Sequence, residues 1–153
     1  MQKQSIEIVL RALSQAQVRY LVVGGLAVVA HGYVRFTADL DLVLDPDPES
    51  LHRAIEALSA LKYRPRAPVL FADFENPEKR QEWAREKGLT VFSLFSPEHP
   101  ATEIDLFVEP PFDFDRAYSQ AIRLEVASGV TATFVGRADL VEMKRRAGRP
   151  QDL

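Results

Sequence analysis

The sequence predicts one α+β domain in which helices and short strands share a core. Several segments carry apolar residues at helical spacing, whereas others are short apolar runs typical of strands. Two of these runs are joined by a proline-containing loop, and two others flank an Ala-Ser-Gly turn, so both pairs are expected to be antiparallel. At 153 residues the chain suits a single domain over 1–153 rather than two.

The first half of the chain predicts helices that alternate with two strands. Apolar residues follow helical spacing up to residue 16, and a short apolar run then precedes Gly24-Gly25. The segment after the glycines is apolar on nearly every face, which is typical of a short helix packed behind a sheet. The predicted elements are a helix over 3–16, a strand over 19–23, a short helix from Gly24, a strand that carries Asp39 and Asp41 and ends at Asp45, and a helix that starts at Pro48 and extends to 61.

The second half predicts a polar helix, four strands and two further helices. Pro65 and Pro68 interrupt a strand-like segment, which is therefore expected at an edge of the sheet. Gly88 is expected to cap the polar helix, because glycine accepts a left-handed conformation there. The predicted elements are an edge strand over 69–71, a helix over 77–87, strands over 89–95 and 103–108, a helix over 115–120, a hairpin formed by 122–126 and 130–135, and a helix over 136–147.

Composition excludes several classes of protein and site. The sequence has no cysteine, which excludes disulfides, thiolate catalysis and cysteine-based metal sites. A net charge of −3 argues against a broadly basic nucleic-acid binder, although Lys144 and its neighbours form a local cationic segment. The sequence shows neither a signal-peptide pattern nor an apolar run of about 18 residues, so a cytoplasmic protein without membrane contact is expected.

Two carboxylates stand among aliphatic residues in the predicted second strand. Asp39 and Asp41 are two positions apart, so on a strand both point to one face with Cα atoms about 6.5–7 Å apart. An unpaired charge buried there costs several kcal/mol, which favours a positive partner. The spacing suits a pair of divalent ions about 3.5–4 Å apart, and magnesium prefers oxygen ligands. Asp105 repeats the pattern, and it completes a cluster of three acids if its strand lies beside the first.

An alternative is that these acids simply occupy the solvent face of a half-buried sheet. Leu40 and Leu42 would then face the core, and the same explanation holds for Asp105. The glycine turn upstream favours the functional interpretation. Gly24-Gly25 lies between a strand and a helix, where the backbone can approach a phosphate closely.

These motifs together resemble the nucleotidyltransferase superfamily of the polymerase-beta type. The likeness rests on Gly24-Gly25, on the segment Arg35-Phe36-Thr37-Ala38-Asp39-Leu40-Asp41, and on the tail GRADLVEMKRRAGRPQDL. The branch it resembles most is that of the minimal and AbiEii-like toxin nucleotidyltransferases. The resemblance implies a mixed β-sheet flanked by helices and transfer of a nucleoside monophosphate from a nucleoside triphosphate, such as ATP, to a hydroxyl group on RNA or protein. It also implies a partner chain, as antitoxin or toxin.

The resemblance also implies roles for individual residues. Asp39, Asp41 and Asp105 would bind two Mg²⁺ ions, for which Mn²⁺ can substitute, and Asp105 would help to deprotonate the acceptor. The residues implied in nucleotide binding are Gly24, Gly25, Arg35, Thr37 and Lys144. Gly25 departs from the commoner serine of the superfamily turn, but agrees with the AbiEii-like branch.

Two alternatives remain open at the level of sequence. Relatives in that branch continue into further helices, so the chain is either a minimal enzyme or a nucleotide- or partner-binding module that catalyses no transfer. The cations from Lys144 to Arg146 can instead complement the dipole of the last helix. Trp83 either packs over the sheet or offers an exposed contact to a base or a partner. The oligomeric state and the acceptor are not predicted.

Overall fold

The computed structural model describes residues 3–30 and 39–147 of the chain. The helices are α1 (Lys3–Gln15), α2 (Gly24–Ala30), α3 (Pro48–Ala60), η1 (Phe71–Glu75, a 3₁₀ helix), α4 (Pro77–Lys87), α5 (Phe114–Ser119) and α6 (Arg137–Ala147). The strands are β1 (Tyr20–Val23), β2 (Asp39–Leu44), β3 (Arg64–Pro65), β4 (Val91–Phe95), β5 (Glu103–Phe107), β6 (Ile122–Ala127) and β7 (Val130–Phe134).

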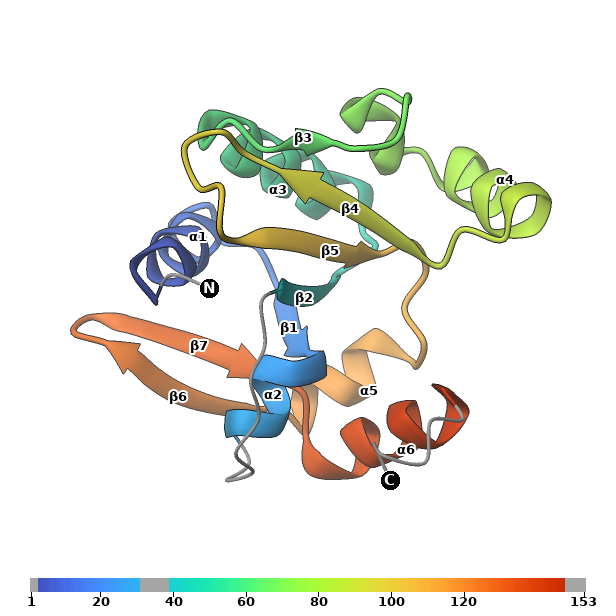
Figure 1. Cartoon of the computed structure of the whole chain (residues 1–153). Helices are drawn as coiled ribbons and strands as arrows, with labels where there is room; N and C mark the ends of the chain where they lie inside the picture. The colour runs from blue at the N-terminus through green and yellow to red at the C-terminus, as the bar shows by residue number, and fades with distance from the viewer. Residues whose placement is uncertain (1–2, 31–38, 148–153) are drawn as a thin grey trace.

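The seven strands form one mixed sheet with helices around it (Figure 1). Their order is β3-β4-β5-β2-β1-β7-β6. Strand β2 lies in the middle, antiparallel to β1 and parallel to β5. The expected α+β fold with a mixed sheet flanked by helices is therefore confirmed. In the described part of the chain, no helix is long and apolar enough to cross a membrane.

The core is centred on β1 and β2. All four residues of β1 are buried, and Leu40 and Leu42 on β2 are fully buried. Antiparallel pairing sets Val23 opposite Asp41, so the last residue of β1 leads directly into α2 beside the acidic positions of β2. The most buried part of the sheet thus supports the strand that carries two carboxylates.

Local sequence signals explain where helices begin and end. Asp47 caps α3 by accepting a hydrogen bond from the backbone N–H of Ser50, and Asn76 caps α4 in the same way. Gly88 ends α4 in the left-handed conformation with φ of 63°, as its position predicted. The predicted strand pair and hairpin are likewise observed as β4–β5 and β6–β7.

The predicted edge strand over 69–71 is wrong. The edge strand is β3, which lies a few residues earlier and pairs with β4 only through Arg64 and Pro65. Phe71 instead begins η1, in which Phe71 and Phe74 are both buried. A 3₁₀ turn brings residues three apart onto one side, so both rings reach the core where a strand would have placed them on opposite faces.

Trp83 packs over the sheet and is only 4% exposed. Its ring stacks on Phe92 of β4, with centroids 5.3 Å apart and planes within 11°. Phe71 and Phe74 contact the same ring, so the four residues form one aromatic cluster. The interpretation of Trp83 as an exposed contact is therefore wrong, and the packing alternative is observed.

Candidate active site

Three acidic side chains from two neighbouring strands share one face of the sheet. Asp39 and Asp41 lie on the face of β2 opposite to Leu40 and Leu42, since side chains alternate along a strand. The parallel register of β2 and β5 sets Asp41 directly opposite Asp105. It also sets Glu103 opposite Asp39. Adjacent strands are about 4.8 Å apart, so the acids meet across the strand pair.

The solvent-face alternative describes only half of this arrangement. Leu40 and Leu42 do face the core, as that alternative expected. Asp39, Asp41 and Asp105, however, are all partly buried rather than freely exposed. The carboxylates therefore lose part of their hydration at the point where they approach one another, which is costly unless a positive group compensates for it.

The environment of Asp41 disfavours its charged form. Burial, followed by the nearby charges of Asp105 and Asp39, raises the pKa of Asp41 to about 7. Burial also raises the pKa of Asp39, with Asp105 and Glu103 adding repulsion. Ionisation of all the acids at once is therefore unfavourable in the metal-free site.

Gly24 explains why the turn before α2 contains glycine. Its φ is +71°, a left-handed conformation that other residues adopt at a cost. A Cβ atom at this position would lie 2.1 Å from Oδ2 of Asp41, which is impossible without displacement of the carboxylate. The backbone of the turn therefore contacts the carboxylate of Asp41. Gly25 is buried in the first turn of α2.

Ser93 of β4 is a site residue that the sequence did not indicate. It lies opposite Asp105 in the antiparallel β4–β5 pair, and its hydroxyl donates a 2.7 Å hydrogen bond to Oδ1 of Asp105. This bond holds the carboxylate in one orientation. A single serine between Phe92 and Leu94 carries no recognisable motif in the sequence.

Lys144 of α6 brings positive charge to the acids. Its charge favours the ionised form of Asp41 and so lowers the pKa of that carboxyl, against the larger effects that raise it. Helices α6 and α2 contact each other, and Figure 1 shows them together beside the end of β1. Lys144 therefore lies within electrostatic reach of the carboxylates, whichever role it has. Arg35 and Thr37 lie outside the described residues.

The donor set suits a divalent cation in chemistry, although it is not a ready-made metal site. Carboxylate oxygens are the ligands that magnesium prefers, and the excess negative charge at Asp39, Asp41 and Asp105 favours a cation. Within residues 3–30 and 39–147, no three acidic or histidine side chains are already arranged to hold a metal ion. The carboxylate of Asp105 is instead held by the hydroxyl of Ser93.

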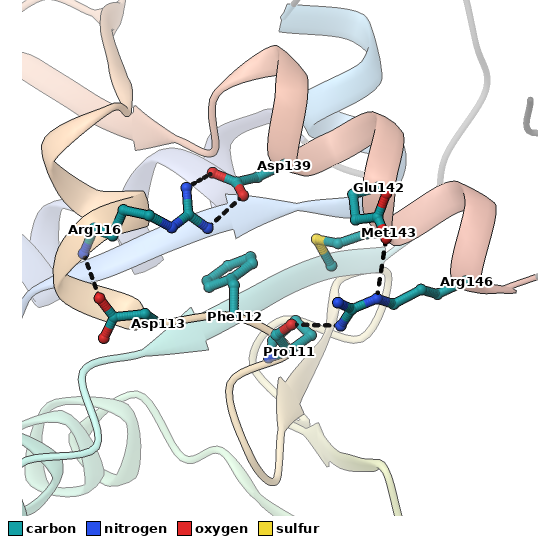
Figure 2. A pocket seen from close by; sticks show the side chains of 8 residues that line it. All are labelled: Pro111, Phe112, Asp113, Arg116, Asp139, Glu142, Met143 and Arg146. Atoms are coloured by element: carbon teal, nitrogen blue, oxygen red, sulfur yellow. Dashed lines mark hydrogen bonds and ion pairs between the residues drawn. The ribbon is translucent and has the colours of Figure 1, made fainter.

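A cavity of about 250 Å³ lies beside the site, between α6 and the segment that leads into α5 (Figure 2). At one end Arg116 forms a bidentate ion pair with Asp139, which is 8% exposed. At the other end Arg146 pairs with Glu142 and donates to the carbonyl of Pro111. The cavity is lined by Pro111, Phe112, Asp113, Arg116, Asp139, Glu142, Met143 and Arg146.

Helix α6 thus contributes residues both to the acidic site and to the cavity. Lys144 of α6 acts on Asp41, whereas Asp139 and Arg146 of α6 close the two ends of the cavity.

A comparison of the sequence with protein-family models and with curated proteins finds no match. The site is therefore described by its own contacts: the carboxylates of β2 and β5, the turn at Gly24, and the cation of α6.

Proposed function

We propose that the chain is a magnesium-dependent nucleotidyltransferase. It would move a nucleoside monophosphate from a nucleoside triphosphate to a hydroxyl group on RNA or protein, with release of pyrophosphate. One observation carries this proposal: the carboxylate of Asp41 contacts the backbone turn at Gly24 and lies opposite Asp105 on the neighbouring strand. Metal ions held by these carboxylate oxygens would thus lie beside the glycine turn, close to the phosphates of a bound triphosphate.

Asp39, Asp41 and Asp105 would hold Mg²⁺, and Mn²⁺ could replace it because both ions accept carboxylate oxygens. When bound, the ions would supply positive charge to the phosphates and make the acceptor hydroxyl more acidic. Without a cation, the carboxylates of the two strands would repel the negatively charged triphosphate, so a divalent ion is required between them.

The residues of the chain would position and deprotonate the reactants. Asp105, oriented by the hydroxyl of Ser93, would accept the proton of the acceptor hydroxyl. Lys144 would place its charge on the triphosphate beside the acids. The absent side chain of Gly24 leaves room for the carboxylate of Asp41 against the turn.

Incubation with labelled nucleoside triphosphates, Mg²⁺ and a pool of RNA or protein acceptors tests this proposal. Label is expected to enter an acceptor with the wild-type chain and to be lost with Asp39→Ala or Asp41→Ala. Glu86→Gln is a matched control, because Glu86 is an exposed acid on α4 outside the site. If transfer survives the double substitution of Asp39 and Asp41, the proposed site is wrong.

A second candidate is a nucleotide- or partner-binding module that catalyses no transfer. The observation that favours it is that, among the described residues, no three acidic or histidine side chains are arranged to hold a metal ion. Calorimetry with a non-hydrolysable nucleotide would detect binding, and magnesium-dependent release of pyrophosphate would exclude this candidate. The resemblance to the AbiEii-like branch supports, for either candidate, a cognate chain of a toxin–antitoxin pair as partner.

A further inference from the structure

Strand β6 forms an outer edge of the sheet. It pairs with β7 on one side, and among the described residues no strand pairs with its other side. Arg123, Leu124 and Glu125 at its centre are exposed, and Leu124 is 39% exposed although it is a large apolar residue. In Figure 1 the β6–β7 hairpin projects from the body of the molecule, with β6 on the outside. An open strand edge offers backbone N–H and C=O groups to another strand.

The order of residues in β6 is self-complementary. From position 121 to 127 the chain reads Ala-Ile-Arg-Leu-Glu-Val-Ala, with Leu124 at the centre. In an antiparallel pair of two such strands, centred on Leu124, Arg123 of each copy faces Glu125 of the other. Leu124 then faces its own equivalent. Cross-strand pairs of opposite charge and of apolar side chains both favour pairing.

The edge carries only part of the usual protection against pairing. Protected edges carry proline, charged side chains or a β-bulge. Positions 122–127 contain no proline, and the two charged residues at the centre have opposite signs. The irregular register between Glu125 and Ala127 lies towards the hairpin turn and leaves Arg123 and Leu124 regularly paired with β7.

The charged side chain at this edge is already oriented by its own chain. The guanidinium of Arg123 lies over the ring of Tyr118 of α5, 4.9 Å from its centroid. A side chain held in this way loses less freedom when it forms a new ion pair. The Arg123 side chain thus has a preferred orientation against α5 in the single chain.

We infer that this face binds a second copy of the same chain by antiparallel pairing of β6 about a two-fold axis at Leu124. The contact is isologous, so each copy contributes the same residues and the assembly closes as a dimer. The sheets of the two copies join into one continuous sheet. The contact is short, and the dimer is therefore expected to dissociate on dilution. The inference is independent of the proposed transfer reaction.

Charge reversal tests the pairing. Analytical ultracentrifugation of the wild-type chain is expected to show a monomer–dimer equilibrium. Glu125→Arg or Arg123→Glu alone should weaken association at least about tenfold, because two attractive cross-strand pairs become repulsive. A mixture of these two variants should form a heterodimer, and the double variant Arg123→Glu with Glu125→Arg should recover the homodimer. Circular dichroism checks that every variant is folded.

A cysteine at the proposed axis gives a second test. The sequence contains no cysteine, so Leu124→Cys introduces the only thiol, and directly opposed Cβ atoms would be about 4.5–5.5 Å apart. Oxidation should cross-link this variant, whereas Thr131→Cys, at an exposed position on the neighbouring strand β7, should form no covalent dimer. A wild-type chain that is monomeric at all concentrations, association unchanged by Glu125→Arg, or equal cross-linking at Thr131 would overturn the inference.

Discussion

Replacement of Asp41 by asparagine is predicted to stabilise the metal-free protein above neutral pH while it abolishes transfer. The pKa of Asp41 is raised from 3.8 to about 7, first by burial and then by the charges of Asp105 and Asp39. Between these two values the folded state keeps a proton that the unfolded state has lost. The free energy of unfolding therefore falls as pH rises from about 4 to about 7 and stays low above it.

The size of the effect follows from the same pKa. One pKa unit corresponds to about 1.4 kcal/mol, so the charged carboxylate of Asp41 could cost about 4 kcal/mol in the folded state. Partial access of water screens the charge and reduces this cost, and we expect about 2 kcal/mol. Asparagine has the same shape, carries no charge, and can donate a hydrogen bond to the carboxylate of Asp105.

Urea unfolding in the presence of EDTA, at pH 4 and at pH 8, measures this effect. Asp41→Asn should exceed the wild type by about 2 kcal/mol at pH 8 and differ little at pH 4, where the carboxyl is largely protonated in the folded state and close to half protonated in the unfolded state. Glu86→Gln, an exposed acid on α4, should change neither value. A variant that is no more stable than the wild type at pH 8, or equally stabilised at both pH values, would refute the reasoning.

Three further substitutions have defined outcomes. Gly24→Ala should destabilise the protein by about 2 kcal/mol in urea unfolding, since the new Cβ would clash with Asp41 in a left-handed turn; an unchanged midpoint would contradict this. Ser93→Ala should lower kcat for transfer about tenfold by releasing Asp105, with KM little changed; an unchanged kcat would count against orientation by Ser93. Trp83→Ala should cost about 3–5 kcal/mol by opening a cavity in the aromatic cluster, measured as a fall in Tm; a small fall would indicate that Trp83 adds little to the core.

Much of the fold was predictable because each element carries its own local signal. Helix α4 begins after Asn76 with proline and ends at Gly88, and both boundaries can be identified from residue types alone. Strand β2 was predictable from its run of aliphatic residues, and Asp39 and Asp41 stood out because they are charged residues within that run. The failure at 69–71 shows the limit, because a short apolar run can be a strand or a 3₁₀ turn that faces the core.

The site was less predictable, since it depends on which strands are neighbours. Asp105 lies on a strand that the sequence identified, but its position opposite Asp41 follows from the order of the sheet. Ser93 reaches Asp105 only because β4 is the next strand, and one hydroxyl in a strand has no signal of its own. Gly24 was singled out for phosphate, whereas its contact with Asp41 required the antiparallel pairing of β1 and β2.

The parallel pairing of β2 and β5 also has a consequence for how the chain folds. Asp41 and Asp105 are 64 positions apart in sequence, so the loop that joins them must close before the acids can meet. Contacts of such high sequence separation slow folding, whereas the β6–β7 hairpin forms from local contacts. We expect the hairpin to gain protection from hydrogen exchange early and the acidic cluster to assemble late. In a partly folded chain the carboxylates would therefore still be apart. They would neither repel one another nor support the proposed chemistry.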